Sequence, residues 1–304
     1  MSRIATYDTT GGPEVLHLTD VPDVEPGAGE VAIRVRAVGL NPFDAKVRSG
    51  FIPMEAPFPR RIGSDLAGTV DAVGRGAVYA DGTPVSVGDE VMGRAAGAVA
   101  ERVVTRPDGL CRRPEALPVE VAASLNVPGL TAVSCLVTVP VTAADTVLVG
   151  GAAGAVGIIA AQLVRDAGAR AIGTAAERNH DLLRSVGVEP VIYGDGLVDR
   201  VRALGEITAV IDCHGRDALD AGIALGVPVE RMVAIAAYGA EAELGVHNAE
   251  RAARTPANLA QLADRAASGD LVLPIAATFP LDEVRQAFAT MEGPHAAGKI
   301  VIVP

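Results

Sequence analysis

The stretch VLVGGAAGAVG, residues 147–157, constrains the fold of this chain more than any other segment. An apolar run ends at Gly150 and an apolar helical pattern starts after Gly154, which predicts a strand–turn–helix unit. Within it, Ala152-x-Gly154-x-x-Gly157 has the spacing of the dinucleotide-binding fingerprint, with Ala at the first glycine position. Gly154 would let the backbone approach a pyrophosphate, Gly157 would allow close helix–strand packing, and the helix would supply amide donors. The alternative is a purely structural glycine-rich turn.

The surrounding pattern predicts an α/β chain with two domains. Beyond residue 120, short apolar strands alternate with helical patterns, which is typical of a doubly wound parallel sheet. The strands are expected at 146–150, 169–174, 189–193, 208–213 and 231–239, and the helices at 118–137, 154–168, 179–187 and 258–271.

The rest of the chain has strand patterns of period two, broken by Pro and Gly. Strands are expected at 30–40, 65–74, 88–94 and 98–105. They indicate a barrel or a strongly bent sheet, to which the C-terminal section returns. We therefore predict one domain from 1–120 and 272–304, and a dinucleotide-binding domain from 121–271.

Composition excludes several classes of function. The 304 residues carry 26 basic and 37 acidic side chains, a net charge of −11, which disfavours nucleic-acid binding. No apolar run approaches the roughly 20 residues of a membrane helix, and the N-terminus does not resemble a secretory signal. The three cysteines have no CxxC spacing, so neither a disulfide framework nor a structural zinc lobe is indicated. We expect a cytoplasmic protein without partners among nucleic acids or membranes.

The end of the second strand of the parallel sheet indicates which dinucleotide is bound. NAD sites place an acidic residue there to accept from the ribose 2′-hydroxyl. Here the segment is GTAAERN (173–179), in which Thr174 ends the strand and Arg178 follows. An Arg can bind a 2′-phosphate through two hydrogen bonds, so NADPH is favoured. Glu177 argues for NADH, although it lies late for the acidic position, and Arg178 as an ordinary exposed charge is the other alternative.

Ordered blocks along nearly the whole chain resemble the medium-chain dehydrogenases/reductases, in particular the zinc-independent quinone oxidoreductase and enoyl reductase branch. The blocks are YDTTGGPEVL (7–16), GLNPFDAKVRSG (39–50), IGSDLAGTVDAVG (62–74), VGDEVMG (87–93), AVAERVV (98–104), VPGLTA (127–132), DTVLVGGAAGAVG (145–157), GTAAERNHDLLRSVG (173–187), TFPLDEVRQAF (278–288) and GKIV (298–301). The resemblance implies a GroES-like substrate domain, a Rossmann NADPH-binding domain, an active site between them and a homodimer.

The resemblance also implies a reaction without a metal. Where the zinc-dependent branch has its metal ligands, this chain has Asn41, Ser64 and about Val127, a set that does not bind zinc. Without a metal, reduction of a quinone or an α,β-unsaturated carbonyl is favoured over alcohol oxidation, because charge spreads to an oxygen that a few donors can stabilise. We expect Asp44 and Asp65 to hold loops through backbone hydrogen bonds rather than to act as bases.

The two lysines of the chain, Lys46 and Lys299, are candidates for function, because every other basic side chain is arginine. If the resemblance holds, Lys46 faces the substrate and stabilises an enolate oxygen, whereas Lys299 lies near the cofactor. Tyr238 follows a strand of the parallel sheet, where it could stack on the substrate or supply a proton. For each of the three, an ordinary surface or packing role is the alternative.

The remaining candidates are cofactor contacts. The glycine turn contributes Ala153, Gly154, Ala155 and Val156, and the nicotinamide end Asn41, Thr131, Ala236 and Ala237. Tyr193, in VIYGDG, is a candidate for the 2′-phosphate but lies one place early for the family pattern. The family also often has His or Ser where this chain has Gly150 and Gly151. Competing hypotheses are a reductase for one large biosynthetic substrate and a non-catalytic NADPH sensor.

Overall fold

The computed structural model describes residues 1–293 and 298–304, which form two compact units. The first unit comprises Met1–Val127 with Thr255–Pro304, and the second Pro128–Arg254. The second unit is shorter at both ends than the predicted 121–271. At its C-terminal end the difference is helix α9 (Pro256–Ser268), which packs on strand β8 (Leu110–Arg112) of the first unit.

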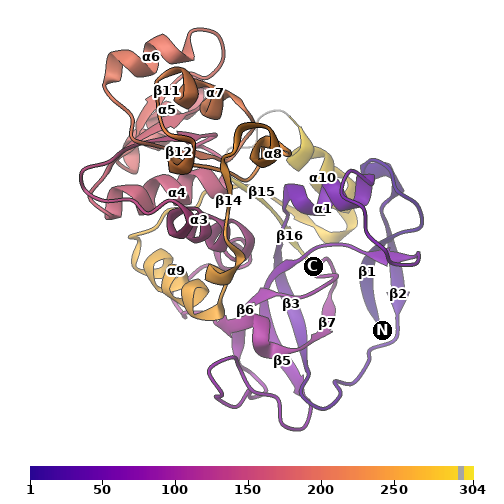
Figure 1. Cartoon of the computed structure of the whole chain (residues 1–304). Coiled ribbons are helices and arrows are strands. Elements are labelled where there is room, and N and C mark those ends of the chain that lie inside the picture. Colours follow the sequence, from indigo (N-terminus) through magenta and orange to yellow (C-terminus); the bar gives the residue numbers. More distant parts are fainter. Residues whose placement is uncertain (294–297) are drawn as a thin grey trace. The chain divides into compact units, whose positions relative to one another are not determined.

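The first unit is a GroES-like β-rich domain built on two sheets (Figure 1). A small sheet has the order β2-β1-β4, and a larger one has the order β15-β16-β3-β5-β6-β8, with β7 paired to β3. The strands are β1 Ser2–Tyr7, β2 His17–Val21, β3 Val31–Gly39, β4 Arg60–Arg61, β5 Asp65–Val73, β6 Glu90–Arg94, β7 Arg102–Thr105, β8 Leu110–Arg112, β15 Ile275–Pro280 and β16 Lys299–Val303. Its helices are α1 Pro42–Ser49, α2 Val119–Ala122, α9 Pro256–Ser268 and α10 Val284–Glu292.

Strand β3 shows why this half folds as a sheet. Its residues alternate through the middle of the strand, so that Val35 is buried while Arg34 and Arg36 on either side face outward. The buried side chains join those of β5, α10 and β16 in one core, which includes Leu66, Phe288 and Ile300. The C-terminal segment therefore completes the core of the N-terminal half.

The second unit is a Rossmann sheet of parallel strands in the order β11-β10-β9-β12-β13-β14. The strands are β9 Thr146–Gly150, β10 Arg170–Thr174, β11 Glu189–Val191, β12 Ala209–Asp212, β13 Met232–Ala234 and β14 His247–Asn248. The helices are α4 Ala155–Asp166, α5 His180–Ser185, α6 Leu197–Leu204, α7 Asp217–Ala224 and α8 Ala240–Leu244, and α3 (Asn126–Thr138) leads into the unit. Strand order reverses between the neighbours β9 and β12, which is where doubly wound sheets bind their ligands.

Several elements differ from the sequence prediction, among them the strand expected at 98–105, which begins only at Arg102 as β7. The helix predicted at 118–137 is broken into α2 and α3, and Pro128 sits in the first turn of α3, where its missing N–H costs no hydrogen bond. Strand β11 ends at Val191 instead of 193, and β13 ends at Ala234 instead of 239. Beyond the end of each strand, a polar side chain forms hydrogen bonds with backbone groups that a longer strand would use to pair with its neighbour. No helix among the described residues is both long and apolar enough to span a membrane.

Candidate functional site

The turn after β9 forms a tight cradle at the point where the strand order reverses. Gly151 has φ +65°, a left-handed conformation that favours glycine. A Cβ on Gly157 would lie 2.3 Å from the carbonyl oxygen of Gly151, so only glycine allows helix α4 to pack this closely on the turn. The turn is tied to β10, because Gly151 N donates to Thr174 Oγ1 at 2.9 Å and Ala152 N donates to the Thr174 carbonyl at 2.9 Å.

This cradle fits the pyrophosphate of a dinucleotide. Helix α4 begins at Ala155, and its first-turn amides have no acceptor within the helix. Gly154, Ala155 and Val156 are all partly exposed there, whereas the side chain of Ala153 is buried. The partial positive charge of the helix N-terminus adds to the amide donors. The geometry that the fingerprint predicted is therefore present.

Two neighbouring loops carry the residues expected at the adenosine ribose. Strands β10 and β11 pair with Thr174 opposite Val191, and Ala175 N donates to the Val191 carbonyl at 3.0 Å. The loops that follow these strands thus start side by side at one edge of the sheet. The first contains the exposed Arg178 and Glu177, and the second contains Tyr193, whose side chain is 47% exposed.

Asp212, at the end of β12, is a site residue that sequence reasoning missed. Its buried carboxylate accepts from the backbone N–H groups of His214 at 3.1 Å, Gly215 at 2.9 Å and Ala237 at 3.3 Å. Burial raises the pKa of Asp212, and these backbone donors oppose the shift. The carboxylate therefore joins the loop after β12 to the loop after β13, and an acidic residue ending a strand beside the switch point was the available signal.

The loop after β13 holds three other predicted residues. Ala236 and Ala237 are partly exposed, and Tyr238 is 55% exposed at the carboxyl edge of the sheet. Thr131 lies on α3 and is buried. This chain has Gly150 and Gly151 where the family often has His or Ser, and the structure gives a local reason. A Cβ on Gly151 would lie 2.6 Å from Cβ of His214. The loop after β12 leaves no room for a side chain at that position.

In the first unit, Asn41 and Lys299 meet in a buried polar cluster. The ammonium of Lys299 donates to the Leu40 carbonyl at 2.7 Å and to Asn41 Oδ1 at 2.7 Å. Asn41 Nδ2 donates to the Gly39 carbonyl at 3.3 Å, to Ser64 Oγ at 3.4 Å and to Asp65 Oδ2 at 3.1 Å. Both ends of the amide are thus engaged within the protein. Both side chains are interior groups, 3% and 4% exposed, and the cofactor contacts expected of Asn41 and Lys299 stay predictions.

Two carboxylates complete this cluster. Asp44 Oδ2 accepts from the Asn41 backbone N–H at 3.1 Å, and Asp65 accepts from Val127 N at 2.9 Å and Asn126 Nδ2 at 2.8 Å. The prediction that both hold loops is confirmed. Burial, reinforced by the charge of Asp65, raises the pKa of Asp44 to about 7. Burial also raises the pKa of Asp65, which the positive charge of Lys299 opposes.

The donor set of this cluster does not fit a zinc ion. Of the three residues expected in place of zinc ligands, Asn41 has its amide engaged at both ends and Ser64 offers only a hydroxyl. The third was expected at about Val127, which has an alkyl side chain, and the Lys299 ammonium already supplies a positive charge in the cluster. Among residues 1–293 and 298–304, no group of three or more His, Cys, Asp or Glu side chains could hold a metal ion.

The other reactive side chains are placed as follows. Lys46 lies on α1 and is partly exposed. Burial raises the pKa of the Cys213 thiol well above its ordinary value, which makes it a poor nucleophile at neutral pH. This agrees with a packing role for Cys213.

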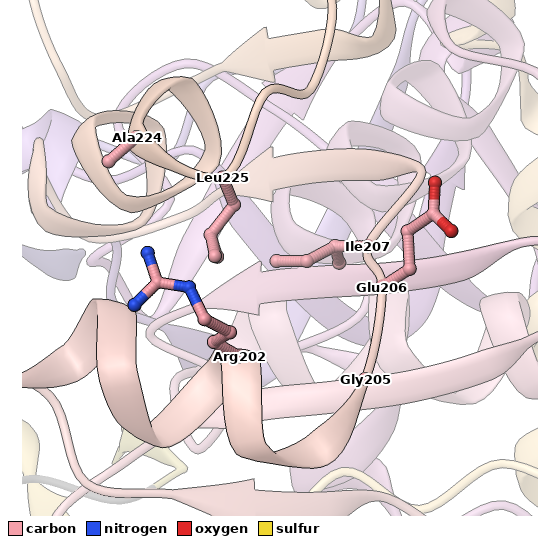
Figure 2. A pocket seen from close by; sticks show the side chains of 6 residues that line it. All are labelled: Arg202, Gly205, Glu206, Ile207, Ala224 and Leu225. Carbon is pink, nitrogen blue, oxygen red and sulfur yellow. The ribbon is translucent and has the colours of Figure 1, made fainter.

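A pocket of about 360 Å³ lies at the opposite edge of the parallel sheet (Figure 2). Arg202 and Gly205 at the end of α6 and Leu225 after α7 line it, together with Ile207, which precedes β12. Ligands of doubly wound sheets bind at the carboxyl ends of the strands, whereas this pocket lies where β12 begins. It is therefore separate from the cradle.

Comparison with known proteins agrees with this fold. The family model of the alcohol dehydrogenase GroES-like domain matches residues 27–148, and that of zinc-binding dehydrogenases matches residues 186–302. A quinone oxidoreductase of Pseudomonas aeruginosa is 29% identical over the whole of both chains, and one of Salmonella typhimurium is 30% identical over 73% of this chain and 69% of its own length. A mycobacterial protein solved in complex with NADPH is 31% identical, with a TM-score of 0.86 over 99% of this chain and 100% of the other.

Proposed function

Because this chain belongs to the quinone oxidoreductase branch of the medium-chain dehydrogenases/reductases, we propose that it reduces a quinone or an α,β-unsaturated carbonyl compound by hydride transfer without a metal. It is an NADP-dependent oxidoreductase with NADPH as its cofactor. The observation that carries the metal-free proposal is the Lys299–Asn41 contact, which places an ammonium in the polar cluster of the first unit.

The residues of the second unit hold the cofactor in this proposal. The amides at the start of α4 bind the pyrophosphate, with Ala153, Gly154, Ala155 and Val156 forming the turn around it. Thr174, Arg178 and Tyr193 lie at the 2′-phosphate, and Thr131, Ala236 and Ala237 at the nicotinamide end. Bound NADPH supplies the hydride.

Two side chains act on the acceptor. Hydride addition to the conjugated system places negative charge on a carbonyl oxygen, and the Lys46 ammonium stabilises that charge. A proton from Tyr238 or from solvent then completes the reduction. Asn41, Asp44, Asp65 and Lys299 act from the interior by fixing the start of α1 and the start of α3. We further propose that the protein is a cytoplasmic homodimer. Light scattering after gel filtration measures its molar mass and so tests the dimer.

The experiment is oxidation of NADPH and NADH at 340 nm with a panel of quinones and enones, with and without a chelator. We expect NADPH oxidation that the chelator leaves unchanged, with the best acceptor defining the substrate class. Loss of activity in chelator would overturn the metal-free proposal. NADPH binding without turnover of any simple acceptor would favour one large substrate instead.

A further inference from the structure

One side chain shapes the loop that follows β11. Arg200, on α6, donates through Nε to the Ile192 carbonyl at 3.1 Å and through Nη1 to the Asp195 carbonyl at 2.8 Å. Its Nη2 donates to the carbonyls of Ile192 at 2.9 Å, Tyr193 at 3.2 Å and Gly194 at 3.3 Å. The guanidinium therefore binds four consecutive carbonyl oxygens of residues 192–195, an arrangement that we call the Arg200 clamp.

The clamp depends on the shape of the arginine side chain. A guanidinium presents its donors in a planar fork, whereas a lysine ammonium is a point donor with three hydrogens. In the part of the chain that the structure describes, no carboxylate forms an ion pair with Arg200, so its donors serve the loop. Gly194 and Gly196 have φ of +81° and +77°, so the chain reverses around the guanidinium. The clamp also explains why β11 ends at Val191.

The loop presents Tyr193 at the edge of the sheet that carries Arg178. Thr174 and Val191 are register partners, so the loops after β10 and β11 begin at the same level. Arg178 is exposed in the first loop, and Tyr193 is 47% exposed in the second. Among the described residues, neither the Arg178 guanidinium nor the Tyr193 hydroxyl has a hydrogen-bonding partner within the chain, so both are available to a ligand. The positive charge of Arg200 behind the loop adds to the attraction for an anion.

We propose that Arg200 is a positioning residue for recognition of the 2′-phosphate: through the clamp it holds the Tyr193 loop beside Arg178, so that the two side chains contact that phosphate together. Arg200 itself acts through the loop backbone and does not touch the cofactor. The inference rests on the proposed assignment of Arg178 and Tyr193 to the adenosine ribose.

The test uses 2′,5′-ADP and 5′-AMP, which differ only by the 2′-phosphate, as ligands of the full-length protein in calorimetric titrations. Arg200→Lys keeps the charge but loses the fork, and we expect it to bind 2′,5′-ADP about tenfold more weakly, the equivalent of one to two lost hydrogen bonds. Binding of 5′-AMP should stay within about twofold of wild type. Arg202→Lys is the matched control, since Arg202 lies on the same helix and pairs with the exposed Asp199, and it should change neither affinity.

Parallel weakening of both ligands in Arg200→Lys would show a merely structural role and overturn the inference, and so would unchanged binding of both. Hydrogen exchange of residues 192–196 in the wild-type protein gives a readout that does not depend on a folded variant. We expect 2′,5′-ADP to protect this loop more than 5′-AMP does, and equal protection would contradict the proposal. Equal affinity of the wild type for both ligands would also refute the assignment of Arg178 and Tyr193 to the 2′-phosphate. None of these measurements depends on which quinone or enone the enzyme reduces.

Discussion

The Lys299 ammonium lies 2.7 Å from Oδ1 of Asn41, with both side chains inside the first unit. Lys299 is on β16 near the C-terminus, and Asn41 precedes α1 near the N-terminus. Burial lowers the pKa of Lys299, while the charges of Asp65 and Asp44 oppose that shift. The Lys299 ammonium therefore donates to the Leu40 carbonyl and to the side-chain oxygen of Asn41. Its positive charge also interacts with the carboxylates of Asp44 and Asp65.

Removing this cation should destabilise the protein strongly. Lys299→Met keeps much of the side-chain volume but leaves Asp44 and Asp65 buried without a positive charge, which costs about 3–5 kcal/mol. The free energy of unfolding in urea measures the effect. Arg75→Met, an exposed loop position of the same unit, is the control and should stay within about 0.5 kcal/mol of wild type. Equal values for the two variants would contradict the role given to Lys299.

The stability contributed by Asp44 should fall as pH rises. Its pKa is raised from 3.8 to about 7, so between these values the folded state holds a proton that the unfolded state has lost. This contribution is present in full below about pH 4 and is lost as pH rises through about 7. Asp44→Asn removes the titration. The free energy of unfolding of the variant should therefore rise relative to that of the wild type between pH 5 and pH 8, by about 2.5–3 kcal/mol, because about two pH units of the shift lie in this range. Urea titrations of both proteins at each pH measure the difference, and a difference that does not change with pH would refute the shift.

A methyl group on Gly157 should disrupt the cradle. The added Cβ would meet the Gly151 carbonyl oxygen at 2.3 Å, so the helix or the turn must move. We expect Gly157→Ala to lose about 1–3 kcal/mol of stability and to bind NADPH at least about tenfold more weakly. Gly215→Ala, where a Cβ has open space and φ is not positive, is the control for stability. Wild-type NADPH affinity in Gly157→Ala would show that the turn does not hold the pyrophosphate.

Neutralising Asp212 should loosen two loops together. Asp212→Asn leaves one carbonyl oxygen where two carboxylate oxygens accepted three backbone N–H groups. We expect a loss of about 1–3 kcal/mol and faster amide exchange at both residues 213–216 and residues 235–238. Asp217→Asn, at the exposed start of α7, should cost less than about 1 kcal/mol and leave exchange of the second loop unchanged. Faster exchange in only one loop would mean that Asp212 does not join them.

Local sequence patterns were sufficient to predict the elements that position the cradle. Alternation in β3, the apolar run of β9 and the glycine spacing before α4 each act within a few neighbouring residues, so they can be interpreted without a fold. Asp44 and Asp65 were likewise recognised as loop-holding residues. Boundaries were predicted less well where a distant polar group competes for the backbone, as Arg200 does after β11 and Asp212 after β13.

By itself, the sequence determined the class of fold and the dinucleotide fingerprint, because strand and helix periodicity and glycine spacing are local properties of the chain. It also determined the preference for NADPH, which rests on Arg178 and the lack of a carboxylate at the end of the strand before it. Tertiary structure decided which polar side chains are interior. Asn41 and Lys299 are separated by most of the chain, yet they share a hydrogen bond, and both belong to a buried polar cluster that their sequence neighbourhoods did not indicate. Which side chains are buried and which form hydrogen bonds depends on which strands become neighbours in the sheet. Strand β16 lies beside the end of β3 that precedes Asn41 only in the folded first unit.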